Sequence, residues 1–99
     1  MGFEQRYDLD AIREFVMNEL SNQNGLLPDA FPMTQRILTR QGVTCGVFYC
    51  LHGPRNIRLT AVFDFDAARV LLYDSRGQRT CSYALSEVVE EVVTTPHAC

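Results

Sequence analysis

The stretch VTCGVFYCLH, residues 43–52, decides the fold of this chain. Its odd positions are all apolar or aromatic, whereas its even positions mix polar, small and aromatic groups. The same alternation follows in IRLTAVFD at residues 57–64, and a third short apolar run, RVLLYD, covers residues 69–74. Because successive side chains of a strand point to opposite faces, these runs predict three antiparallel strands with one buried face.

The connections between these runs predict how the strands pair. A short turn after the second run opposes Asp64 to Arg69 and Phe63 to Val70, which matches opposite charges and brings core residues together. In the first two runs the odd residues share a face, so the link at residues 52–56 must be an odd-length loop or contain a bulge. The sequence thus predicts a meander with a defined register.

Helices are expected on both sides of this meander. Asp8 is a suitable N-cap for a helix over about residues 9–21, whose apolar residues have helical spacing. A proline at the start and a glycine at the end predict a second helix over residues 32–42. A fourth strand is expected at residues 79–82, followed by a helix over residues 83–94 with valines on one side and glutamates on the other.

These elements predict an α+β fold of the order ααβββ(β)α. It is an antiparallel meander of three to four strands, with two N-terminal helices and one C-terminal helix. With 99 residues the chain is long enough for one hydrophobic core, so residues 1–99 are expected to form a single domain. Hydrophobic residues make up 46% and charged residues 21% of the chain, a balance typical of globular proteins.

The charge and the cysteines of the chain indicate in which compartment it works and which class of partner it binds. The nine basic residues are all arginine, and with twelve acidic residues they give a net charge of −3, which disfavours nonspecific binding to phosphate backbones. Residues 1–20 are charged throughout and lack the apolar centre of a signal peptide. We therefore expect a cytoplasmic location, reduced thiols and no membrane partner. The thiols concerned are those of Cys45, Cys50, Cys81 and Cys99.

One face of the predicted sheet is too apolar for a solvated surface and too polar for a core. This face is expected to contain Thr44, Phe48, Cys50, His52, Arg58, Thr60, Val62, Leu71 and Tyr73. The residues expected to bind a partner are Phe48, His52, Arg55, Arg58 and Tyr73. The arginines suit a carboxylate or phosphate, and the two aromatic rings supply apolar contact. A covering helix, a second copy of the chain or a ligand would each account for such a face.

Cys50 and His52 form a candidate catalytic pair. They project from the same face of a strand, and Arg55 and Arg58 nearby would stabilise a thiolate. Residues two apart on a strand lie about 6–7 Å apart, which is long for direct proton transfer, so a buried structural thiol is the competing interpretation. The cysteines and histidines lack the paired knuckles of zinc sites, and neither a metal nor a cofactor is expected.

The predicted order of helix, three strands and helix over residues 29–94 resembles the core of the double-stranded RNA-binding domain, and this resemblance implies RNA binding. Members of that family carry a lysine-rich start to the last helix and a Gly-Pro-x-His loop. Here the last helix opens with Glu87, Glu90 and Glu91, and the loop reads HGPR at residues 52–55. RNA binding is therefore an alternative to the preferred function.

The sequence favours a small binding module over an enzyme. The expected partner is another protein or a second copy of the chain, as in a homodimer, with a small anionic ligand as an alternative and nucleic acid disfavoured. The competing interpretation is a small enzyme that uses Cys50 and His52. Neither a substrate nor a reaction type follows from the sequence.

Overall fold

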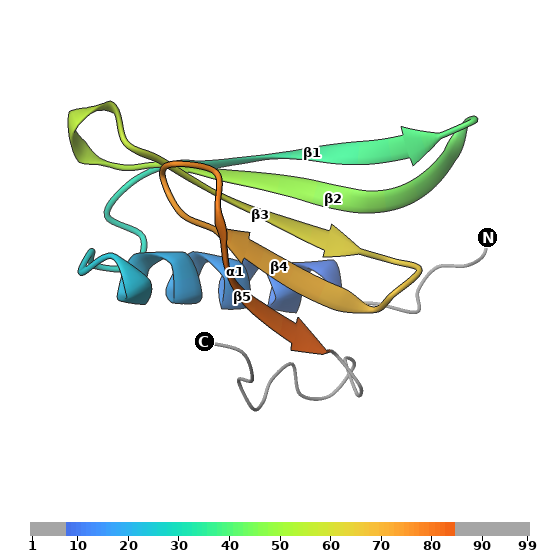
Figure 1. Cartoon of the computed structure of the whole chain (residues 1–99), viewed down its shortest axis with the longest axis horizontal. Helices are drawn as coiled ribbons and strands as arrows, with labels where there is room; N and C mark the ends of the chain where they lie inside the picture. The colour runs from blue at the N-terminus through green and yellow to red at the C-terminus, as the bar shows by residue number, and fades with distance from the viewer. Residues whose placement is uncertain (1–7, 85–99) are drawn as a thin grey trace.

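The computed structural model describes residues 8–84, which form one helix and a five-stranded antiparallel sheet. Helix α1 spans Leu9–Gln23. The strands are β1 (Met33–Arg40), β2 (Val43–His52), β3 (Arg58–Asp64), β4 (Arg69–Tyr73) and β5 (Arg79–Ala84), with a short 3-10 turn, η1, at Pro54–Asn56. Each strand pairs with the next one along the chain, so the sheet order is β1-β2-β3-β4-β5. β1 and β5 therefore form the two edges (Figure 1).

Helix α1 forms where the sequence predicts it. The carboxylate of Asp8 accepts a hydrogen bond from the backbone N–H of Ala11 at 3.1 Å, which satisfies one of the free donors of the first turn. Ile12, Val16 and Leu20 lie on one stripe of the helix and are fully buried. This stripe packs against β2, β3 and β4, so α1 covers the middle of one face of the sheet.

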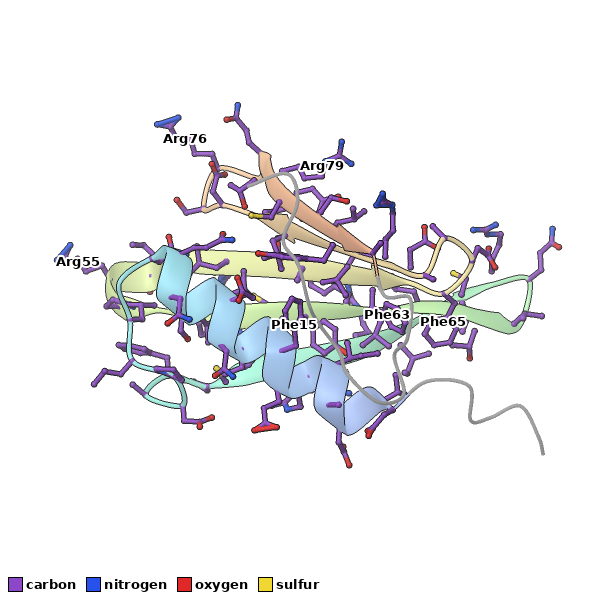
Figure 2. The ribbon with its side chains drawn as sticks, turned by 90° about the horizontal axis from the view of Figure 1, so that it is seen from below. Phe15, Arg55, Phe63, Phe65, Arg76 and Arg79 are labelled. Carbon is purple, nitrogen blue, oxygen red and sulfur yellow. The ribbon has the colours of Figure 1, made fainter. Side chains whose placement is uncertain are left out.

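The core lies between α1 and the strand residues that face it. Those residues are fully buried: Val47, Tyr49, Leu51, Leu59, Ala61, Phe63, Val70 and Leu72. Phe63 belongs to this buried core and Phe15 of α1 packs against it; both are labelled in Figure 2, which looks at the sheet past α1. The ring of Phe15 meets that of Tyr83 edge to face, with centroids 5.0 Å apart, so α1 also contacts β5.

Polar side chains of α1 bind both edge strands. Arg13 donates from Nη2 to the carbonyl oxygen of Met33 in β1 at 2.9 Å. At the opposite edge, the hydroxyl of Tyr83 donates to Glu19 Oε1 at 2.8 Å, and Gln23 Nε2 donates to the sulfur of Cys81 at 2.9 Å. The helix is therefore bonded across the whole width of the sheet.

The register predicted for the middle strands is confirmed. Asp64 pairs with Arg69 and Phe63 with Val70, as the alternation of charged and apolar residues indicated. His52 pairs with Arg58, so the connection between β2 and β3 contains five residues and has the odd length that a shared core face requires.

The predicted second helix is wrong, because residues 33–40 form β1. Gly42 fits a helix end in the sequence, but with Gln41 it forms the two-residue turn that joins β1 to β2. Their φ angles of 81° and 53° are the left-handed values that such hairpin turns require. β1 has a single buried residue, Met33, so it lacks the alternation that marks the middle strands. The fold has one described helix and five strands instead of the order ααβββ(β)α, and the helix-first order that resembled the RNA-binding domain is absent from residues 29–84.

The predicted last helix is contradicted at its start. The strand expected at residues 79–82 is present and continues to Ala84, so residues 83 and 84 belong to β5. The rest of the predicted helix lies outside the described residues.

A bulge interrupts β2 and changes which residues face the core. Leu38 pairs with Gly46 but Thr39 pairs with Thr44, so Cys45 has no counterpart in β1. Thr44 consequently shares a face with the odd residues of β1 and leaves the predicted binding face. Val43, which the alternation placed in the core, is 66% exposed. A side chain at Gly46 would collide with the carbonyl of Phe63, which explains why glycine stands next to the bulge.

Candidate partner-binding face

The second face of the sheet, which α1 does not cover, is called here the open face. Strand pairing aligns its residues in rows that cross all five strands. One row contains Thr34, Cys50, Thr60, Tyr73 and Arg79, and the next contains Arg36, Phe48, Val62, Leu71 and Ser82. Directly paired residues of antiparallel strands lie about 4.5–5.5 Å apart, so each row is a continuous set of neighbours.

The centre of the open face is apolar. Phe48, Val62 and Leu71 are consecutive in their row, and each is only half-buried. The guanidinium carbon of Arg36 lies 5.3 Å from the centroid of the Phe48 ring, within the range of a cation–π contact. The apolar strip is thus bordered on the β1 side by an arginine held over its aromatic ring.

His52 and Arg58 form one end of the open face, where they pair across β2 and β3. His52 Nε2 lies 3.1 Å from the hydroxyl oxygen of Thr34, which is hydrogen-bond distance. The structure therefore brings together four of the five predicted partner-binding residues on one face: Phe48, His52, Arg58 and Tyr73.

Arg55, the fifth predicted residue, is placed elsewhere. It belongs to the 3-10 turn between β2 and β3, has a φ of 58° and is exposed. In Figure 2 its side chain projects away from the sheet at one end of the molecule. Arg55 is therefore outside the rows that make up the open face.

The balance of charge differs between the two sides of the described fold. Arg36, Arg58, Arg69 and Arg79 occupy open-face positions of four different strands. The carboxylate on this face, Asp64, accepts hydrogen bonds from the backbone N–H groups of Asp66 at 3.0 Å and Ala67 at 3.3 Å, so it serves the adjoining turn. The acidic residues of the helix and its cap lie on the opposite side: Asp8, Asp10, Glu14 and Glu19. A chain with net negative charge thus presents a cationic, partly apolar face.

Of these four arginines, only Arg58 is among the partner-binding residues predicted from the sequence. Arg36 lies in the segment predicted as the second helix, so the predicted face contained no residue of β1. Arg69 and Arg79 lie at the ends of predicted strands and were not considered as binding residues. The register predicted for Asp64 and Arg69 already placed Arg69 beside the open face and was the signal that could have found it.

Cys50 and His52 share the open face, as their spacing predicted. The Cys50 thiol is free and only 8% exposed, and it lies between Thr34 and Thr60 in its row. The imidazole of His52 is bonded to Thr34. The catalytic role of this pair stays a prediction.

The cysteines and possible metal ligands are dispersed. Within residues 8–84, no group of three or more His, Cys, Asp or Glu side chains is arranged to hold a metal ion. Cys45 and Cys50 carry free thiols, whereas Cys81 is disulfide-bonded, so the expectation of reduced thiols is wrong for Cys81.

Comparisons with known proteins give no further guide to the site. Neither a protein-family model, nor a curated protein, nor a solved structure matches the chain. The helix in the described part of the chain is not long and apolar enough to cross a membrane.

Proposed function

We propose that this protein is a binding module whose open face holds an acidic segment of a partner protein. The observation that carries the proposal is the set of four arginines around the strip of Phe48, Val62 and Leu71, which α1 leaves uncovered. Arginine binds carboxylates through two parallel hydrogen bonds, and an adjoining apolar strip accepts the aromatic or aliphatic side chains of the same segment. The two kinds of contact together give the combination found at the centres of protein interfaces.

Charge complementarity favours an acidic partner over a second open face. Two open faces packed together would bring arginine against arginine, which costs free energy in a desolvated interface. An acidic segment would instead neutralise these side chains and associate faster at low salt. Single-stranded RNA is the competing anionic ligand, because bases stack on accessible aromatic rings, and Phe48 and Tyr73 are both half-buried on this face.

The test uses labelled twelve-residue peptides in which glutamate alternates with leucine and phenylalanine, and binding is followed by fluorescence anisotropy and amide chemical shifts. We expect binding that weakens as salt rises, with shifts in β2 and β4. Exchanging Arg58 and Tyr73 together (R58Q with Y73S) should lower the affinity at least tenfold, because it removes one charged and one aromatic contact.

Arg76→Gln is the matched control for this experiment. Arg76 is exposed in the turn between β4 and β5 and points away from the sheet (Figure 2), so its loss removes the same charge without touching the open face. Equal losses in R76Q and in the double variant would show that only net charge matters. Tighter binding of a single-stranded oligoribonucleotide than of the peptides, or no peptide shifts at millimolar concentration, would overturn the proposal.

A further inference from the structure

β1 differs from the inner strands in that it is exposed along most of its length. Among its eight residues only Met33 is buried, and α1 packs on β2, β3 and β4. An edge strand with free N–H and C=O groups is a template for pairing with another strand. Whether β1 has such groups depends on which of its residues point outward.

Three observations show that the odd residues of β1 direct their backbone groups outward. The N–H of His52 donates to the carbonyl of Pro32 at 2.9 Å, so even positions bond to β2. The two-residue turn closes on Arg40 paired with Val43, which again places an even position toward β2. Hydrogen-bonded and non-hydrogen-bonded pairs alternate along an antiparallel ladder, so the backbone N–H and C=O groups of the odd residues point away from β2. The carbonyl of Met33, which Arg13 reaches from α1, is an outward group of this kind.

Arg13 divides the edge into an occupied part and an open part. It bonds both the carbonyl of Met33 and the side-chain oxygen of Gln35, at 2.9 and 2.5 Å, and thereby covers the start of β1. The outward backbone groups from Gln35 to Thr39 lie beyond it. The bulge in this hairpin lies in β2 at Cys45, so β1 itself stays regular up to Arg40. The open part is therefore a straight five-residue edge.

We propose that this edge pairs with the same edge of a second copy of the chain, antiparallel and centred on Ile37. In this register Ile37 faces Ile37 of the partner subunit, and Arg36 faces Leu38 of the partner subunit. Gln35 likewise faces Thr39 of the partner subunit. All outward groups of the open part then meet outward groups, because odd residues pair with odd residues.

Charge selects this register over its neighbours. Centring the pair on residue 36 would oppose Arg36 to Arg36 of the partner subunit, and centring it on residue 38 would oppose Arg36 to Arg40 of the partner subunit. Like charges directly opposite each other destabilise a strand pair. Centring on Ile37 avoids both contacts and covers an apolar side chain that is 47% exposed in the single chain.

The pairing joins two sheets into one and places the two open faces side by side on the same surface. It concerns the edge of the sheet, so it goes beyond the proposed function and does not depend on it. A dimer of this kind would offer an acidic partner two cationic faces in a fixed relation.

The test measures the mass of the full chain by sedimentation equilibrium between 1 and 200 µM. We expect a reversible dimer for the wild type and for Ile37→Val, and a monomer for Ile37→Lys, which places two ammonium groups against each other on the two-fold axis. Val43→Lys is the matched control, because Val43 is more exposed than Ile37 but lies on β2 away from the edge, and this variant should stay dimeric.

Hydrogen exchange provides a second, independent readout. The amides of Ile37 and Thr39 should be protected in the wild type and exchange at least tenfold faster in the folded Ile37→Lys monomer. A wild type that is monomeric at 200 µM, or a dimer that survives Ile37→Lys, would overturn the proposal. Peptide binding to the open face should be unchanged in Ile37→Lys, so this result separates failure of the dimer from failure of the proposed function.

Discussion

The two faces of the sheet are built from alternate residues of the same strands, yet they obey different constraints. Leu72 and Leu71 are neighbours in β4 and have the same side chain. Leu72 is fully buried against the layer of α1, whereas Leu71 is half-buried on the open face. The position of one helix, and not the composition of the strands, therefore decides which apolar residues stabilise the fold and which are free to contact a partner.

The largest expected effect on the free energy of unfolding comes from replacing these two leucines, one at a time, by alanine. Leu72→Ala should lower the free energy of unfolding by about 2–5 kcal/mol, because it leaves a cavity in the closed layer. Leu71→Ala should cost about 1 kcal/mol, because its site is already open to water. Urea unfolding followed by circular dichroism measures both. Equal costs would show that the open face is covered in the isolated protein.

Alkaline pH should lower the free energy of unfolding through two tyrosines on the helix-covered face. Burial raises the pKa of Tyr49 to about 12 against the attraction of Arg13, and burial together with the bond to Glu19 raises the pKa of Tyr83 to about 12. Well below pH 10 both phenols are protonated in the folded and unfolded states. As pH rises from 10 to 12 the unfolded-state phenols ionise first, so the free energy of unfolding should fall.

The expected loss is ~1.4 kcal/mol per pH unit for each phenol, or on the order of 2–3 kcal/mol per phenol at pH 12. Urea unfolding at intervals between pH 9 and pH 12 measures it, and the double exchange of Tyr49 and Tyr83 to phenylalanine should flatten the curve. An unchanged slope in that variant would assign the pH dependence to other groups.

The smallest expected change in the free energy of unfolding comes from replacing two buried tyrosines of the same face, Tyr49 and Tyr83, by phenylalanine. The hydroxyl of Tyr49 is buried without a hydrogen-bond partner in the described part of the chain, whereas that of Tyr83 donates to Glu19. Tyr49→Phe should raise the free energy of unfolding by up to about 1 kcal/mol, because it removes an unsatisfied polar group. Tyr83→Phe should lower it by about 1 kcal/mol. Thermal unfolding at pH 7 compares the two, and a loss of stability in Tyr49→Phe would mean that its hydroxyl has a partner.

The sequence was informative where the strands are buried on one face. Alternation in β2 and β3, and the pairing of Asp64 with Arg69, follow from local chemistry and were predictable. The N-cap at Asp8 was predictable for the same reason. Eight of the nine residues predicted for the open face lie on it, all except Thr44, because alternation assigns both faces of a strand at once.

β1 could not be identified because an edge strand without a helix over it buries little and needs no alternation. Its Thr34 and Ile37 favour strands, but the signals of Pro32 and Gly42 fit a helix equally well. The wrong placement of Val43 has another cause. A bulge moves the side chains beyond it to the opposite face of the sheet, and the only sign of it in the sequence is a glycine. Of the arginines on the open face, Arg36 was not predicted because β1 was not identified, whereas Arg69 lies in a correctly predicted strand and its register with Asp64 already placed it on this face.

The bonds from α1 to β5 have a consequence for the order of folding. Each strand pairs with its immediate neighbour in the chain, so the sheet grows by closing short loops. The bonds of Gln23 to Cys81 and of Glu19 to Tyr83 instead join positions 58 and 64 residues apart. Closing loops of that length costs more entropy and is slower. The element that comes first along the described chain therefore completes its contacts last, after the final strand has joined the sheet.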